Sequence, residues 1–295
     1  MLLSTIGLLG GLSLLIYLTI KGVNLLIAAP LCALLVALMS GIPLYANEGS
    51  YFFQSYMGGF AGFVASWYLM FLSGSLFGKM MEGSGNATSI AKFVLKHLGI
   101  KHAALAIVIA CAILTYGGVS VFIVAFAVYP MALSLFREAD LPRRFIPGAL
   151  AFGSVTFTMT SAGSPEIQNW IPTKFLGTTP YAAWQVSLVV AILMAGFGYW
   201  WLSRMIRKAK ANGEGFEYRV ADPHFEEDKE LPHPIIGLLP LVIVIITSAS
   251  LHNTLQTNAL VIALVLGSIT AYIFNIKKFN QLSELINNGV SGSLL

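Results

Sequence analysis

The sequence predicts an all-α polytopic membrane protein, organised as an inverted-repeat transporter with a re-entrant hairpin and a broken helix. Of the 295 residues, 57% are hydrophobic and 10% are charged, whereas soluble proteins average about 25% charged residues. Several apolar runs approach the ~20 residues that cross ~30 Å of hydrocarbon. Two runs contain internal breaks, which a bilayer tolerates only where they line a buried or watery cavity.

Charge and cysteine content exclude several other classes of protein. The formal net charge is +4, but the basic residues lie at the ends of apolar runs, so we expect no nucleic-acid partner. Cys32 and Cys111 lie inside apolar runs, so we expect them to pack there without a disulfide or a metal site. The first run lacks a basic leader and a clear cleavage motif, which predicts a retained helix instead of a signal peptide.

The N-terminal part predicts three spanning helices, over residues 3–20, 24–42 and 57–78. A shorter helix is expected at about 87–98. Its apolar residues follow helical spacing and its lysines lie on another side, which suits a helix in the membrane interface.

The run 103–136 contains no charged residue and is too long for a single span at ~1.5 Å per residue. Gly117-Gly118 divides it into two arms. Two complete spans and a re-entrant hairpin both agree with the flanking charges, but the glycine tip favours the hairpin.

The remaining elements are a broken helix over 145–176, with its break at 161–164, and a clean span over 182–203. Residues 204–233 contain 13 of the chain's 30 charged residues, which predicts a solvated cytoplasmic linker. Two more spans are expected at 235–251 and 257–275. A further helix begins near Leu282.

The basic clusters predict the topology, because positive loops stay on the cytoplasmic side. With Lys21 inside, every basic cluster falls inside as well, and the N-terminus is expected to be periplasmic. The chain also matches itself at a shift of 230 positions: Ile6-Gly7-Leu8-Leu9 corresponds to Ile236-Gly237-Leu238-Leu239. The first copy starts outside and the second starts inside, as in an inverted repeat.

The repeat predicts three parts: a first membrane repeat over 1–203, the linker 204–233, and the start of a second, inverted repeat over 234–295. The second copy lacks its own hairpin and broken helix. Two complete copies would need on the order of 430 residues. We therefore expect a C-terminally truncated product.

The two breaks predict a binding site for an organic anion. Ser120 can cap the second arm of the hairpin, and Ser164-Pro165-Glu166 has the pattern of an N-cap, a first helical position and a first-turn acid. Helix N-termini at membrane depth favour a carboxylate. The candidate substrate-binding residues are Gly117, Gly118, Val119, Ser120, Thr158, Thr160, Ser161, Gly163, Ser164, Gln168 and Asn169.

Packing explanations stand beside these functional ones. Gly117 and Gly118 serve close helix packing and ligand binding about equally well, whereas we favour binding for Ser164, Gln168 and Asn169 together. Glu166 is the only acid in the predicted spans and is a proton-coupling candidate. The simpler interpretation, which we favour, is that Glu166 stabilises a helix start.

Two longer motifs contain the breaks. The first comprises Gly117-Gly118-Val119-Ser120-Val121-Phe122, Ala127-Val128-Tyr129-Pro130 and Leu135-Phe136-Arg137-Glu138-Ala139-Asp140-Leu141-Pro142. The second comprises Thr156-Phe157-Thr158-Met159-Thr160, Gly163-Ser164-Pro165-Glu166-Ile167-Gln168-Asn169 and Ile171-Pro172-Thr173. These motifs resemble the gluconate:proton symporter (GntP) family, and the resemblance covers nearly the whole chain. It implies a proton-coupled permease of the ion-transporter superfamily in a bacterial inner membrane, which takes up gluconate or related hydroxy acids such as 3-hydroxybutyrate.

The expected partners are a gluconate-like anion and the lipid bilayer, with a homodimer as a candidate assembly, and no cofactor besides a proton gradient. The sequence leaves three alternatives to compare with a transporter: a channel, a hydrolase and a non-functional fragment. A channel filter at 115–119 would need a fourfold ring of carbonyls and leaves the second break unexplained. A hydrolase with Ser164 as nucleophile would need a base within reach, so we expect no enzyme. The third alternative, a non-functional fragment of such a permease, stays open.

Overall fold

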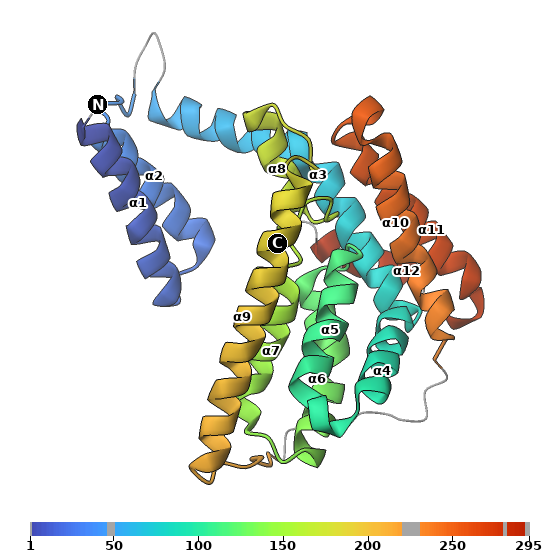
Figure 1. Cartoon of the computed structure of the whole chain (residues 1–295). Helices are drawn as coiled ribbons and strands as arrows, with labels where there is room; N and C mark the ends of the chain where they lie inside the picture. The colour runs from blue at the N-terminus through green and yellow to red at the C-terminus, as the bar shows by residue number, and fades with distance from the viewer. Residues whose placement is uncertain (1, 46–50, 220–230, 280–281, 293–295) are drawn as a thin grey trace. The chain divides into compact units, whose positions relative to one another are not determined.

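The computed structural model describes residues 2–45, 51–219, 231–279 and 282–292, and the described residues form helices and loops without a strand (Figure 1). Within them, five helices are long and apolar enough to cross a membrane. A sixth is counted if α4 (Asn86–Leu98) and residues 100–116, which meet at 105°, form one span. The prediction of an all-α polytopic membrane protein is therefore confirmed. The chain divides into two compact units, residues 1–68 and 69–295.

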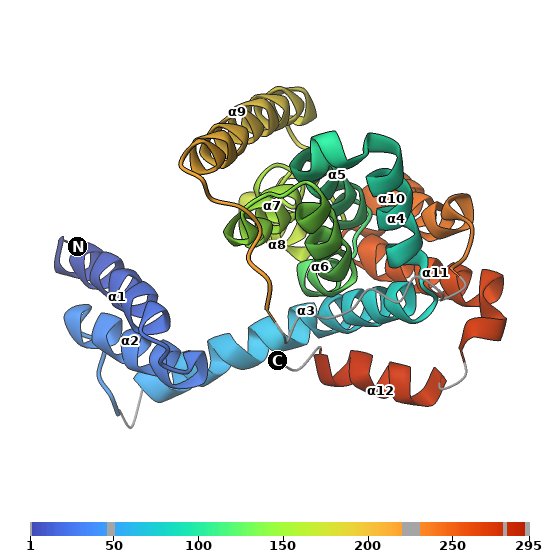
Figure 2. The same ribbon diagram turned by 90° about the horizontal axis from the view of Figure 1, so that it is seen from below.

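The first unit contains a helical hairpin of α1 (Leu2–Ile20) and α2 (Leu25–Met39), which lie side by side (Figure 2). The Asn24 side chain accepts a hydrogen bond of 2.8 Å from the Leu26 N–H and so caps the start of α2. Helix α3 (Phe52–Gly83) begins in the first unit and ends in the second. It extends beyond the predicted span 57–78 at both ends.

The second unit is built around α5 (Ala103–Tyr116), which is almost entirely buried. Helices α4 and α6 (Val121–Glu138) pack against it. The two arms predicted in 103–136 are thus confirmed as two helices that turn at the glycine pair. Whether the arms form a re-entrant hairpin stays a prediction.

The broken helix begins as α7 (Ile146–Ala151) and continues as a π-helical turn, Phe152–Thr156. Gly153 lets this turn approach α5 closely, because a methyl group there would lie 2.5 Å from the Val108 carbonyl oxygen. Regular helix stops at Thr156 and resumes in α8 (Ile167–Leu176). The predicted restart at Pro165 is therefore wrong, and the break is longer than 161–164.

The C-terminal part contains α9 (Trp184–Ala211), the paired helices α10 (Pro234–Leu255) and α11 (Asn258–Phe274), and α12 (Leu282–Gly292). The residues 204–211, expected to belong to the linker, continue α9 instead. The centre of the expected linker lies outside the described residues. Helix α3 begins at Phe52 and α12 at Leu282, a difference of 230 positions. The repeat and its inversion remain predictions.

Candidate functional site

The first break is a glycine-terminated helix end. The Gly118 N–H donates to the Thr115 carbonyl at 2.9 Å, and the Val119 N–H donates to the Leu114 carbonyl at 3.1 Å. Gly118 has φ +90°, a conformation that glycine adopts without steric strain. This pair of hydrogen bonds is the Schellman motif, which satisfies the last carbonyls of a helix without water.

Helix α6 then starts directly from the break. Ser120 occupies the N-cap position, with φ −49° and ψ 137°, but its side chain makes no capping hydrogen bond. The prediction that the Ser120 hydroxyl caps this helix is therefore wrong. The first backbone N–H groups of any α-helix have no partner within the helix, so they can serve another group at this position.

The second break is held by side chains from α8. Asn169 Nδ2 donates to the Ser164 and Pro180 carbonyls, both at 3.2 Å, and Trp170 Nε1 donates to the Ser164 carbonyl at 3.1 Å. Because the Ser164 carbonyl is committed to these donors, the chain stays extended through Glu166, which has φ −78° and ψ 142°. Glu166 is therefore the N-cap residue of α8 in place of Ser164, whose carbonyl accepts from Asn169 and Trp170.

The two breaks lie in direct contact. Tyr116 Oη donates to the Ala162 carbonyl at 3.2 Å. A Cβ atom added to Gly118 would lie 3.1 Å from Pro165 Cγ. Segments that are about 45 positions apart in the sequence thus form one structural unit.

A cavity of about 640 Å³, which we call the central cavity, lies beside this contact. Its lining includes the first turns of both α6 and α8, through Ser120 and Ile123 on one side and Glu166 and Gln168 on the other. Helix α3 and Leu264 of α11 complete it. The volume lies within the ~300–1,000 Å³ that is usual for small-molecule sites.

A second cavity, of about 600 Å³, is lined by Tyr116, Gly117 and residues of α9 and α10. We call it the apolar cavity, because most of its lining comes from side chains such as Leu188, Ile192 and Leu241. Leu241 also packs against the first break, since a Cβ atom on Gly117 would lie 2.7 Å from Leu241 Cδ2.

The chain matches a known family of membrane proteins over most of its length. The sequence model of the family described as GntP family permease matches residues 1–275. The chain belongs to the GntP permease family.

Two relatives of this permease are described only as uncharacterized transporters. One is YxjC of Bacillus subtilis, which is 35% identical over 322 aligned positions, covering 96% of this chain and 68% of the relative. The other is a Haemophilus influenzae protein, 28% identical over 243 positions, covering 80% of this chain and 54% of that protein. The chain thus spans about half of the Haemophilus protein. No solved structure matches it. The permease is accordingly a transporter and a multi-pass membrane protein.

The structure of the permease distributes the predicted binding residues over several environments. The central cavity is lined by Gly118, Ser120, Gln168 and also Glu166. The apolar cavity is lined by Gly117, Thr158 and Ser161. Buried positions are occupied by Val119, Gly163 and Ser164, while Asn169 is half-buried and Thr160 is exposed.

The hydroxyl groups in the apolar cavity are already engaged in this permease. Thr158 Oγ1 donates to the Gly153 and Ser154 carbonyls, at 2.9 and 2.6 Å, and Ser161 Oγ donates to the Phe157 carbonyl. Ser164 Oγ and Glu166 Oε1 differ, because each is buried and has no hydrogen-bond partner among the described residues. Buried polar atoms without partners call for an explanation such as a ligand, an ion or a water molecule.

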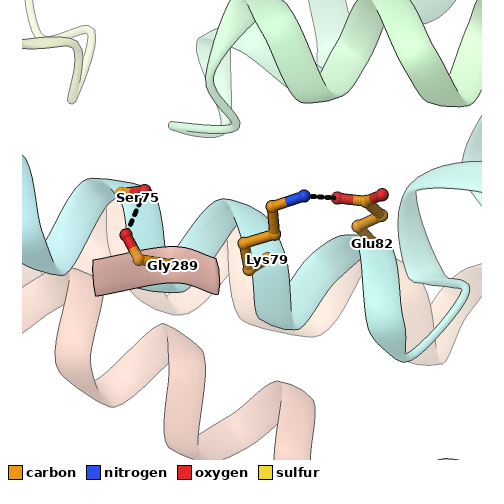
Figure 3. Close-up of polar contacts among 4 residues, drawn as sticks. All are labelled: Ser75, Lys79, Glu82 and Gly289. Carbon is orange, nitrogen blue, oxygen red and sulfur yellow. Dashed lines mark hydrogen bonds and ion pairs between the residues drawn. The ribbon is translucent and has the colours of Figure 1, made fainter. Parts of the chain in front are cut away.

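One lining residue of the permease was missed. Lys79 lines the central cavity, although the sequence indicated only a basic residue at the end of a span. Its Nζ pairs with Glu82 Oε2 at 2.8 Å (Figure 3). The spacing of Ser75 and Lys79, one helical turn apart, is a signal that could have placed both on one face of a longer α3.

Proposed function

We propose that this permease takes up gluconate, or a related small hydroxy acid, by proton symport across a bacterial inner membrane. The observation that carries the proposal is the convergence of two helix N-termini, those of α6 and α8, on one cavity. Membership of a permease family supports a transported ligand.

The chemistry of the central cavity favours an organic anion. Helix N-termini present free N–H groups and the positive end of the helix dipole, both of which stabilise a carboxylate. Ser120 and Gln168 in the lining can bond hydroxyl groups of the ligand. Phe71, Phe122 and Phe126 line other parts of the same cavity and can contact a carbon chain. A small hydroxy acid combines these features.

Glu166 is the candidate for proton coupling. Its carboxyl lines the central cavity, and its Oε1 atom is buried without a hydrogen-bond partner among the described residues. Ionisable groups at membrane depth are costly to keep and commonly serve proton or ion transfer. The proton gradient would supply the energy, and no cofactor enters the proposal.

The topology completes the proposal. We place the N-terminus in the periplasm and the basic ends of the helices, including Lys21, Lys79 and Lys208, in the cytoplasm. Residues 1–203 would form the first repeat and residues from 234 onward the beginning of an inverted second one.

The test is uptake of radiolabelled gluconate by the chain reconstituted in liposomes with an acidic exterior. We expect accumulation that a protonophore abolishes. Glu166→Gln should lose gradient-driven accumulation and retain exchange of labelled for unlabelled gluconate, because exchange needs no net proton transfer. Glu138→Gln, at an exposed acid near the end of α6, is the matched control and should behave like the wild type. Accumulation that persists with the protonophore contradicts symport.

A further inference from the structure

Lys79 brings a positive charge to the central cavity. Phe71, Ser75 and Lys79, which are spaced one helical turn apart along α3, all line it. Among the described residues of the lining, Lys79 is the only cation and Glu166 the only acid.

The position of Lys79 is fixed by close packing of α3 against the start of α6. At Gly78 an added Cβ atom would collide with the Ile123 side chain and lie 3.9 Å from Ser120 Cβ. Glycine is therefore needed where the two helices touch, and the next residue is Lys79. The lysine side chain thus leaves α3 at the level of the N-terminus of α6.

The Lys79 side chain also reaches a second site. It lines a smaller cavity of about 310 Å³, which we call the polar cavity, together with Glu82, Lys278, Glu284 and Asn288. The Lys79 and Glu82 side chains remain 32% and 41% exposed. An ion pair this exposed contributes little to stability, so another carboxylate can replace Glu82 at small cost.

Helix α12 holds the end of α3 in place. Ser75 Oγ donates to the Gly289 carbonyl at 2.7 Å, one turn from Lys79 (Figure 3). At Gly83 an added Cβ atom would collide with Leu285 and lie 3.4 Å from the Phe279 ring. The segment that carries Lys79 and Glu82 is therefore braced on the side of the polar cavity.

We propose that Lys79 is a substrate-binding residue that exchanges Glu82 for the carboxylate of the transported anion at the boundary of the central and polar cavities. The inference rests on the proposed function in one respect, that the ligand is an organic anion. Glu82 holds the ammonium when the cavity is empty, and release of the anion toward the polar cavity restores the Lys79–Glu82 pair.

The charge at this position can be measured without transport. Ser120→Cys places a thiol in the central cavity, and the native Cys32 and Cys111 are buried, so the unsubstituted chain gives the background. The rates of modification by an anionic and a cationic methanethiosulfonate reagent are compared with Lys79 present and with Lys79→Gln. A local cation concentrates anions, so we expect the anionic-to-cationic rate ratio to fall by about threefold or more in Lys79→Gln. Equal anionic-to-cationic rate ratios in Ser120→Cys with and without Lys79→Gln overturn the inference.

Binding of radiolabelled gluconate to the detergent-purified chain then tests recognition. Lys79→Gln should weaken binding by about tenfold or more, as expected when one partner of a charge-assisted pair is lost. Lys79→Arg keeps the charge and should bind within about threefold of the wild type. Lys101→Gln, at an exposed lysine before α5, is the control and should bind normally. Glu82→Gln should tighten binding, because it removes the competing carboxylate.

The two experiments separate the inference from the proposed function. Wild-type affinity in Lys79→Gln overturns the role of Lys79 even when gluconate uptake is robust. A changed reagent ratio in a chain that binds no gluconate supports the positive potential at Lys79 and refutes gluconate as the substrate.

Discussion

Gly118→Ala tests the contact between the two breaks. The substitution has two consequences at the first break. It forces alanine into φ +90°, and it places a methyl group 3.1 Å from Pro165 Cγ and 3.6 Å from Leu264 Cδ2. The first consequence is local backbone strain. The second is steric overpacking between segments that line the central cavity.

A second glycine isolates the strain from the contact. Gly213 ends α9 with the same pair of hydrogen bonds, from Gly213 N–H to Lys210 and from Glu214 N–H to Ala209, at φ +83°. An added methyl group there meets nothing within 4 Å. Left-handed strain should lower the free energy of unfolding by about 1–2 kcal/mol in both alanine variants. Overpacking should add about 1 kcal/mol in Gly118→Ala alone.

The assay is chemical denaturation of the two purified variants in the same detergent, followed by gluconate uptake in liposomes. A further loss of about 1 kcal/mol corresponds to roughly a fivefold change in the folding equilibrium. We expect reduced uptake for Gly118→Ala and normal uptake for Gly213→Ala. If the two variants are equally stable and transport equally well, the contact between Gly118 and Pro165 does not support the site.

Three further substitutions test the second break and the packing beneath it. Ser164→Ala removes a buried hydroxyl without a partner among the described residues, so stability should stay within about 1 kcal/mol; lost uptake in this stable variant would identify a substrate contact. Asn169→Ala removes two hydrogen bonds, one of the two donors to each of the Ser164 and Pro180 carbonyls, and should lower the free energy of unfolding by about 1–3 kcal/mol, whereas an unchanged denaturation midpoint would argue against bracing. Gly153→Ala places a methyl group 2.5 Å from the Val108 backbone oxygen, so the folded peak in size-exclusion chromatography should disappear. Gly148→Ala, with open space at the added carbon, should elute like the wild type.

The positions of the breaks could be predicted because their causes are local. Two adjacent glycines in an uncharged run mark a helix end, and Gly118 indeed adopts the left-handed conformation that ends α5. The restart at Pro165 could not be predicted in the same way. Its local capping signal is outweighed by hydrogen bonds that Asn169 and Trp170 make to the Ser164 carbonyl, which depend on how α8 folds back.

The roles of individual polar residues were harder to predict, because they depend on side-chain direction. Thr158 and Ser161 lie near the site, but their hydroxyls bond backbone carbonyls four or five residues earlier, a common alternative for such residues. Lys79 was missed because α3 is apolar over most of its length. The close approach at Gly78 shows which face of α3 meets α6.

The side chains that pack on the first break come from helices late in the chain. Leu241 of α10 packs on Gly117, and Leu264 of α11 packs on Gly118 and lines the central cavity. Because the chain is synthesised from its N-terminus, the glycine turn leaves the ribosome well before either leucine does. The wall of the central cavity is therefore complete only once α11 has been synthesised and has packed against the first break.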